Sequence, residues 1–329
     1  MITLDLIRKP ISSELEEFEA FVKEKFSADG NLLSEMLQYA LSSRGKAIRP
    51  MLVLLSASMN LPTDKQHISL RTQVAAMLVE MIHVASLIHD DVIDESDTRR
   101  GKPSPNARWQ SRNAVILGDY ILARNMSVGM SSGQFDIVTH VCSSIATLCE
   151  GEIYQSDCAR RQVFSRTAYL DIIHKKTASL MGISASAGAL SVGAPREKMT
   201  LMRHFGESIG MAFQIQDDIL DYARTSHTGK PANNDLREGK VTLPLLVVLE
   251  HASAVQRTEI LAKLALCPTD DAAVEWLQTL VEQEKGVVAA AQVMNDYLQS
   301  AKEMLTAYED SPYRKALLAL CDYIAKRDR

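Results

Sequence analysis

Two acidic clusters of the same form are the residues best suited to chemistry in this chain. The sequences DDVID at 90–94 and DDILD at 217–221 each interrupt an otherwise apolar stretch. On a helix, residues four apart share a face, so the first and last carboxylates of each cluster can point to one place. Acidic groups among apolar neighbours need cationic partners. Carboxylates without clustered His or Cys suit Mg²⁺, which typically bridges them to phosphate oxygens, so the pattern predicts a magnesium site for a phosphorylated substrate.

Basic side chains accompany both clusters. Arg99 and Arg100 follow the first cluster and precede a Gly-Lys-Pro helix stop, which leaves two guanidiniums near the carboxylates. Arginine binds phosphate through two parallel hydrogen bonds. Together, the basic positions predict two anion sites around one metal cluster. The other basic positions in this set are Lys46, Arg49, Lys176 beside Thr177, Lys230 and Lys240.

These motifs resemble those of the trans-isoprenyl diphosphate synthases. IHDDVID at 88–94, with TRRGKP at 98–103, is similar to the family's first aspartate-rich motif, and GMAFQIQDDILD at 210–221 is similar to the second. The likeness runs from about 45 to 244 with the motifs in family order. The smaller motifs are GKxxRP at 45–50, ExxH at 80–83, GD at 118–119, GExxQ at 151–155, KT at 176–177 and GK at 229–230 and 239–240. The ending, RDR at 327–329, resembles that of bacterial octaprenyl diphosphate synthases.

The resemblance implies an activity. The expected reaction is the condensation of isopentenyl diphosphate with an allylic diphosphate, farnesyl or geranylgeranyl diphosphate, to give a polyprenyl diphosphate for quinone side chains. The expected cofactor is Mg²⁺, three ions per active site. A homodimer is also implied, with the apolar region 112–157 as its candidate interface.

The resemblance also implies roles for individual residues. Asp90, Asp94 and Asp217 are the expected metal ligands, with Asp91, Asp218 and Asp221 in supporting positions. Arg99, Lys176 and Lys230 are expected to stabilise the departing pyrophosphate. Isopentenyl diphosphate is expected to bind Lys46, Arg49, His83 and Arg100. Thr177, Gln214 and Lys240 complete the expected substrate contacts.

The chain departs from the family pattern in two places. Where the family usually has Gly-Gly-Lys-Arg, residues 44–47 read Arg-Gly-Lys-Ala, which affects the expected grip on isopentenyl diphosphate. Where the family often has Gly-Asp-Asp, residues 233–235 read Asn-Asn-Asp, which affects a water-mediated contact to the metals.

Product length is expected to depend on the residues just before the first cluster. Short-chain members of the family close the product cavity there with aromatic side chains, whereas this chain has Ala85 and Ser86, with Met81 one turn earlier. A second explanation for two small residues at these positions is that they allow neighbouring helices to pack closely. We expect products of about 35 to 45 carbons, with a synthase of about 20 to 25 carbons as the alternative.

The elements that must position these residues are predicted to be helices. Aromatic residues make up only 5% of the chain, helix-forming residues are abundant, and no strand alternation or linker is evident. We therefore expect an all-α, single-domain isoprenoid synthase helical bundle around a central cavity, spanning residues 1–329. The expected helical stretches are 11–27, 31–43, 70–94, 112–130, 134–157, 167–191, 197–223, 240–251, 272–308 and 312–327.

Composition limits the kinds of binding partner and the cellular compartment that we expect for this protein. A net charge of -5 gives no electrostatic footprint for nucleic acid. Five cysteines without metal-type spacing suit a reducing cytosol. No signal sequence or run of about 18 apolar residues is evident, so we expect a cytoplasmic protein that contacts membranes transiently to release product.

Three other functions remain open from the residues. His89-Asp90 is an HD dipeptide, as in helical phosphohydrolases, but that function leaves the second cluster unused. A terpene cyclase typically has a mixed second motif and many aromatics. A non-catalytic subunit of a heteromeric prenyl synthase usually loses one motif, whereas this chain keeps both.

Overall fold

The protein is almost entirely helical in the residues that its structure, a computed structural model, describes: 3–42, 45–62, 67–222 and 233–327. Its only strands in those ranges are β1 (Thr98–Arg99) and β2 (Lys102–Pro103), an antiparallel pair. The predicted all-α class is therefore confirmed. The contacts divide the chain into two compact units that interleave in sequence, and the expectation of a single domain stays a prediction.

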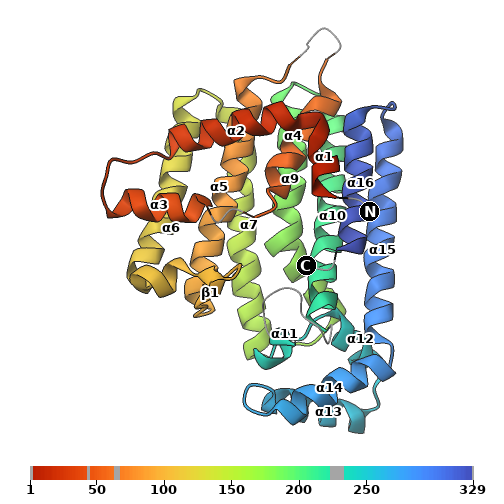
Figure 1. Ribbon diagram of the computed structural model, residues 1–329. Helices are drawn as coiled ribbons and strands as arrows, with labels where there is room; N and C mark the ends of the chain where they lie inside the picture. The colour runs from red at the N-terminus through yellow and green to blue at the C-terminus, as the bar shows by residue number, and fades with distance from the viewer. Residues whose placement is uncertain (1–2, 43–44, 63–66, 223–232, 328–329) are drawn as a thin grey trace. The chain divides into compact units, whose positions relative to one another are not determined.

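The first unit contains the first acidic motif. It comprises Met1–Ala146, Leu180–Gly206 and Leu305–Leu320. Its central element is α5 (Leu70–Ile93), which packs against α2, α4 and α6 (Figure 1). The elements that lie wholly or mainly in this unit are α1 (Leu4–Arg8), η1 (Lys9–Ile11), α2 (Ser12–Lys25), α3 (Leu32–Ser42), α4 (Ile48–Asn60), α5, β1, β2, α6 (Pro105–Ser131), α9 (Ser179–Ser191) and η3 (Leu305–Ala307).

The second unit contains the second acidic motif. It comprises Thr147–Ser179, Glu207–Met304 and Cys321–Arg329, and within it α12 packs against α8, α14 and α15. Its elements are α8 (Arg166–Ile173), the π-helical turn η2 (His174–Ala178), α11 (Asn234–Arg237), α12 (Leu243–His251), α13 (Ala254–Leu266), α14 (Asp271–Gln283) and α15 (Gly286–Met304). The unit boundaries fall within α7 (Phe135–Arg160), α10 (Arg196–Asp221) and α16 (Pro312–Lys326).

Several helix ends follow from local side chains. Ser104 accepts a hydrogen bond from the Ala107 amide where α6 begins, and Pro105 occupies the first turn, where its missing N–H costs nothing. Ser253 and Gln256 form a capping box at the start of α13. These signals are local, so the sequence carries them.

The helix predictions missed α1, α11 and α13 entirely and differ from the structure in further places. The stretch 272–308 is two helices, because Lys285 adopts a left-handed φ of 56° between α14 and α15. The stretch 167–191 is helical throughout, as predicted, but a local widening to the π-helical turn η2 separates α8 from α9. Helix α4 was missed because residues 50–57 are all buried, and a helix without a polar face shows no amphipathic period.

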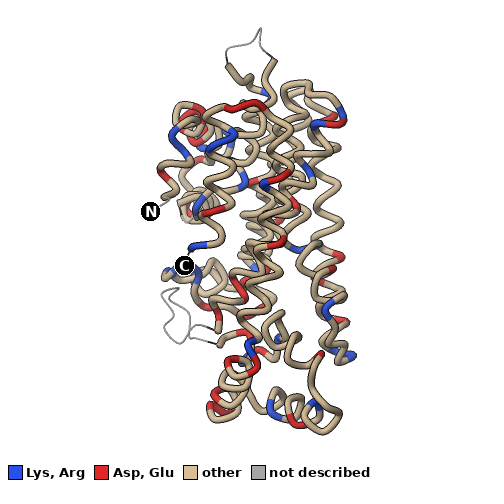
Figure 2. Tube along the Cα trace, turned by 90° about the vertical axis from the view of Figure 1, so that its right-hand side faces the viewer, with Lys and Arg blue, Asp and Glu red and all other residues tan. Residues whose placement is uncertain are grey.

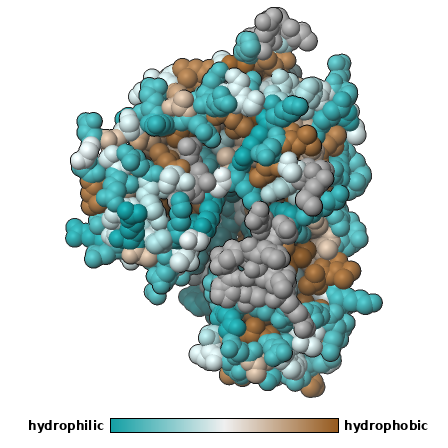
Figure 3. Space-filling view, in the orientation of Figure 1, coloured by the Kyte–Doolittle hydropathy of each residue, from teal (hydrophilic) through white to brown (hydrophobic). Residues whose placement is uncertain are grey.

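Helix α5 is apolar enough to resemble a membrane span. In the described part of the chain it is the one helix that is long and apolar enough to cross a membrane. The most apolar part of the helix has a mean hydropathy of 1.3, and 78% of that part is buried inside the protein. A buried core helix has the same composition. The face of the molecule in Figure 3 is mostly polar with scattered hydrophobic side chains, and Figure 2 shows acidic and basic residues interspersed along the helices.

Candidate active site

The first acidic motif ends helix α5. Asp90 is half-buried on the last turn, and Asp94 is the exposed residue that terminates the helix. Asp91 is 1% exposed and forms an ion pair with Arg99, whose Nε and Nη2 lie 2.7 Å and 2.6 Å from Asp91 Oδ1. A buried carboxylate requires such a partner. The pair ties the β1–β2 hairpin to the helix and commits two of the three guanidinium nitrogens of Arg99.

The hairpin aims Arg100 at a pocket in the same unit. Arg99 pairs with Lys102, and the two residues between them, Arg100 and Gly101, both have positive φ, 54° and 74°. Two-residue hairpins of this geometry favour Asn or Gly at the first position, so an arginine there carries backbone strain. Its guanidinium lies so close to Gly45 that a side chain at 45 would overlap it.

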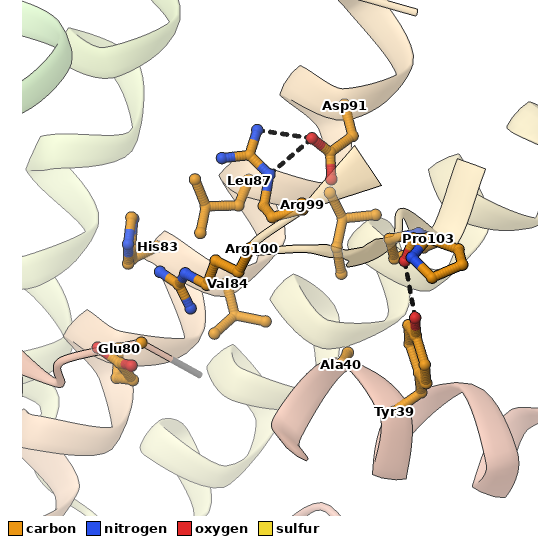
Figure 4. Close-up of a pocket in the computed structure, with 13 residues that line it drawn as sticks. Tyr39, Ala40, Glu80, His83, Val84, Leu87, Asp91, Arg99, Arg100 and Pro103 are labelled. Carbon is orange, nitrogen blue, oxygen red and sulfur yellow. Dashed lines mark hydrogen bonds and ion pairs between the residues drawn. The ribbon is translucent and has the colours of Figure 1, made fainter. Parts of the chain in front are cut away.

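This pocket brings the cationic side chains of Arg99 and Arg100 together with the carboxylates of Glu80 and Asp91. Arg100 is directed toward His83 and Glu80, with Arg99 and Asp91 at the pocket's other end (Figure 4). Burial, followed by the charges of the neighbouring arginines, holds the pKa of His83 well below its usual range, so the imidazole is neutral. Burial lowers the pKa of Arg100, and the charge of Arg99 lowers it further. The pocket therefore suits an anion.

Two more expected basic residues lie at the start of helix α4: Arg49 is in its first turn, and Lys46 is in the loop just before it. Burial lowers the pKa of Arg49 to about 10, and the charge of Glu80 opposes that change, so Arg49 stays cationic near neutral pH. The carbonyl of Lys46 accepts a 2.8 Å hydrogen bond from Arg8 of α1, which fixes the loop. Ala47 has a left-handed φ of 50° before α4, at one of the positions where the chain departs from the family.

We expect Arg100→Gly to stabilise the protein while it weakens anion binding. Glycine removes the left-handed strain, worth about 1 kcal/mol. Arg100→Ala loses the same guanidinium but keeps the strain. Differential scanning calorimetry should give Arg100→Gly a higher thermal midpoint than Arg100→Ala. Titration with isopentenyl diphosphate should show that both variants bind it about tenfold more weakly than the parent. Parent-like binding by either variant would refute the anion site.

The second acidic motif lies on α10, and each of its carboxylates has described partners. Asp218 is buried and accepts hydrogen bonds from the Tyr169 hydroxyl at 2.5 Å and the Gln214 amide at 3.0 Å. Burial, followed by the charge of Asp235, raises the pKa of Asp218 well above its usual range. Asp221 accepts the backbone N–H groups that begin α11, at 3.1 Å and 3.0 Å. The side chain of Asp217 is 44% exposed and forms an ion pair with Arg327 at 2.6 Å.

Lys176 and Thr177 lie on the π-helical turn η2, a conformation common at functional sites. Lys176 Nζ donates to Gln155 Oε1 at 2.5 Å and forms an ion pair with Glu152 at 2.8 Å. Thr177 donates to Gln214 Oε1 at 2.8 Å, and Gln214 in turn donates to Asp218. One chain of hydrogen bonds thus joins Thr177 and Gln214 to Asp218 of the aspartate motif, whereas Lys176 is held by Gln155 and Glu152.

We expect Gly151→Ala to impair this arrangement. A methyl group at 151 would lie 2.8 Å from the Cβ of Lys175 and 3.1 Å from both the Cγ and the backbone nitrogen of Lys176, so η2 must move. Overpacking of this kind typically costs about 1–3 kcal/mol. We expect a lower thermal midpoint and about tenfold weaker binding of inorganic pyrophosphate. Gly30→Ala is the matched control, because nothing lies within 4 Å of that position. Equal behaviour of the two variants would show that η2 accommodates the methyl.

The remaining expected residues are placed as follows. Lys230 lies outside the described residues. Lys240 forms an ion pair with Glu238 at 2.6 Å. At the second departure from the family, Asn233 donates to Gln278 at 3.0 Å and Asn234 donates its N–H to Asp221. Sequence reasoning missed Tyr169 and Arg327, since nothing local marks either as a partner of the aspartates.

The donor set fits a hard divalent cation. Among the described residues no three His, Cys, Asp or Glu side chains are already gathered as a cage. Magnesium does not need one, because it usually takes one or two carboxylates and completes its shell with water and substrate phosphate. Asp90 with Asp94, and Asp217 within its own unit, supply that number at half-buried or exposed positions.

Comparison with known proteins identifies the family. The model of the polyprenyl synthetase family matches residues 30–281, so the chain belongs to that family and is by family a prenyltransferase. This confirms the resemblance seen in the motifs. Similar proteins include heptaprenyl diphosphate synthase component 2 of Geobacillus stearothermophilus, 34% identical over 97% of both chains. Octaprenyl diphosphate synthase of Escherichia coli is 30% identical over the full length of both.

A solved structure shares the fold. The polyprenyl synthase of Caulobacter crescentus, crystallised with calcium and isoprenyl diphosphate, superimposes with a TM-score of 0.90 at 28% identity, covering 99% of this chain and 98% of that one. The isoprenoid synthase fold predicted from the motifs is thereby confirmed. The phosphohydrolase function suggested by the HD dipeptide does not fit this family. His89 instead lies 3.2 Å from the Val115 carbonyl and 3.5 Å from Asp119.

Proposed function

We propose that this protein is a magnesium-dependent long-chain polyprenyl diphosphate synthase that extends farnesyl or geranylgeranyl diphosphate with isopentenyl diphosphate. The observation that carries the proposal is the pairing of two intact aspartate motifs with two separate sets of cationic side chains, one in each unit. The similarity to heptaprenyl, octaprenyl and nonaprenyl diphosphate synthases supports products of about 35 to 45 carbons. A role in quinone side chains and a cytoplasmic location belong to the same proposal.

The pocket of the first unit is suited to hold isopentenyl diphosphate. Arg49 and Arg100 supply fixed positive charge, and neutral His83 can donate a hydrogen bond without adding charge. Its walls include Val84 and Leu87, which give the hydrocarbon part an apolar contact. We propose that these residues orient the double bond, while Lys46 completes the phosphate contacts; Arg99 keeps its proposed role at the departing pyrophosphate.

The cations of the second unit are suited to the allylic diphosphate. Lys176, with Thr177 beside it and Lys230 further along the chain, would stabilise the negative charge that grows on pyrophosphate as its bond to C1 breaks. Asp90, Asp94 and Asp217 would hold Mg²⁺, three ions in the family pattern, which supplies additional charge neutralisation at the same diphosphate. Proton loss to the departed pyrophosphate would complete each condensation.

A homodimer is part of the proposal. Within the first unit, the side chains of Ile116, Met130 and Phe135 are 50–57% exposed on α6 and α7, in the region 112–157 named from the sequence. Exposed apolar residues of this kind often mark an interface. The homologue named as a component shows that a relative of this chain can belong to a heteromeric enzyme, so the lone chain must be tested.

The purified chain, given Mg²⁺, farnesyl diphosphate and labelled isopentenyl diphosphate, should make a polyprenyl diphosphate, and EDTA should abolish it. Chromatography after dephosphorylation gives the length. Products of about 20 to 25 carbons would correct the length and leave the reaction intact. A folded chain that makes no product by itself would favour a non-catalytic subunit of a heteromeric synthase and overturn the proposal.

A further inference from the structure

A buried arginine close to the end of the chain lies against the second aspartate motif. Arg327 Nη2 donates to Asp217 Oδ1 at 2.6 Å and to the Phe213 carbonyl at 2.7 Å. The side chain of Arg327 is only 3% exposed, whereas that of Asp217 is 44% exposed. Asp217 therefore stays partly accessible although it is in contact with Arg327.

Other contacts hold Arg327 in place. Its guanidinium stacks on the Phe213 ring at 3.8 Å, and its carbonyl accepts a 3.1 Å hydrogen bond from Gln216. All these partners lie on α10, within about one turn of Asp217. A ligand that approaches Asp217 meets a carboxylate that already has a cationic partner.

We infer that Arg327 is a fixed counter-ion that keeps the affinity of Asp217 for a divalent cation low until a diphosphate is bound. The inference rests on the proposed function. A guanidinium in contact with a metal-binding carboxylate repels any cation that binds to that carboxylate. The repulsion is strong because the arginine is shielded from water. A bound diphosphate brings several negative charges and offsets it. Metal and diphosphate would then bind together rather than metal first.

Mn²⁺ titrations of the full chain, followed by electron paramagnetic resonance with and without inorganic pyrophosphate, test the inference. Without pyrophosphate, R327Q should bind Mn²⁺ about tenfold more tightly than the parent, because the repelling charge is gone. R327K keeps the charge and should stay within about twofold of the parent. The gain in Mn²⁺ affinity should vanish in the double variant D217N/R327Q. That loss would show that the additional affinity of R327Q comes from Asp217.

The outcomes separate the inference from the proposed function. Unchanged or weaker Mn²⁺ binding by folded R327Q would overturn the counter-ion role, and so would equal changes in R327Q and R327K. If R327Q fails to fold, R327M replaces it with an apolar side chain suited to burial. Failure of both to fold would make Arg327 a structural residue and overturn the inference. If the parent with pyrophosphate binds Mn²⁺ no better than D217N, the metal site of the proposed function itself is wrong.

Discussion

Asp90→Ala and Asp217→Ala should each reduce turnover by about a thousandfold or more while the fold survives. Each carboxylate is a proposed ligand of a shared group of cations, so the loss of one removes much of what the group does. Both side chains are half-buried, which limits the cost to stability. Turnover of isopentenyl diphosphate at saturating Mg²⁺, with circular dichroism to confirm the fold, gives the result.

Asp97→Ala is the matched control for these variants. Asp97 follows the first motif by three residues and is exposed, and the contact described for it uses its backbone carbonyl. The Asp97→Ala variant should retain parent-like turnover. A near-native rate for either motif variant, or full activity in EDTA, would be incompatible with the proposed metal site.

Ala85→Phe should stop chain extension at about fifteen to twenty carbons. The residue lies one turn before the first motif, and we expect the growing tail to pass along this part of α5. Ala85 and Met81 are fully buried in the core of the first unit, so the ring must occupy either product space or packed core. The chemistry at Asp90 should proceed at a comparable rate. Chromatography of the dephosphorylated products gives the lengths.

Ser86→Phe and Ala85→Ser make the result interpretable. Ser86 is half-buried, with its hydroxyl donating to the His83 carbonyl, so a ring there carries less risk of overpacking the core. Ser86→Phe should also shorten the product. Ala85→Ser replaces one small side chain with another and should leave the product length unchanged. Long products from both phenylalanine variants would show that the tail runs elsewhere.

Much of the candidate site could be predicted from the sequence because its signals are local. Four-residue spacing on a helix places Asp90 and Asp94 on one face whatever the fold around them. The Gly-Lys-Pro stop after Arg100 marks the turn that the structure shows as a hairpin. The family could be named from the same motifs, because they recur in fixed order along the chain.

Other features depend on residues far apart in sequence. Nothing near Asp91 reveals that it would be buried on Arg99, whereas Asp90 beside it stays half-exposed, since burial depends on which helices cover that face of α5. Local patterns also fail for fully buried helices such as α4, which show no polar face.

The sequence by itself determined the class of chemistry: carboxylates at helical spacing suit magnesium, and arginines beside them suit phosphate. Only the tertiary structure decided how those charges are balanced. Arg327 lies 110 residues along the chain from Asp217, and Lys176 lies 21 residues from Gln155, yet each pair is in hydrogen-bond contact. Such pairs form because buried charges need partners, and packing selects the partner from the whole chain rather than from the neighbouring sequence.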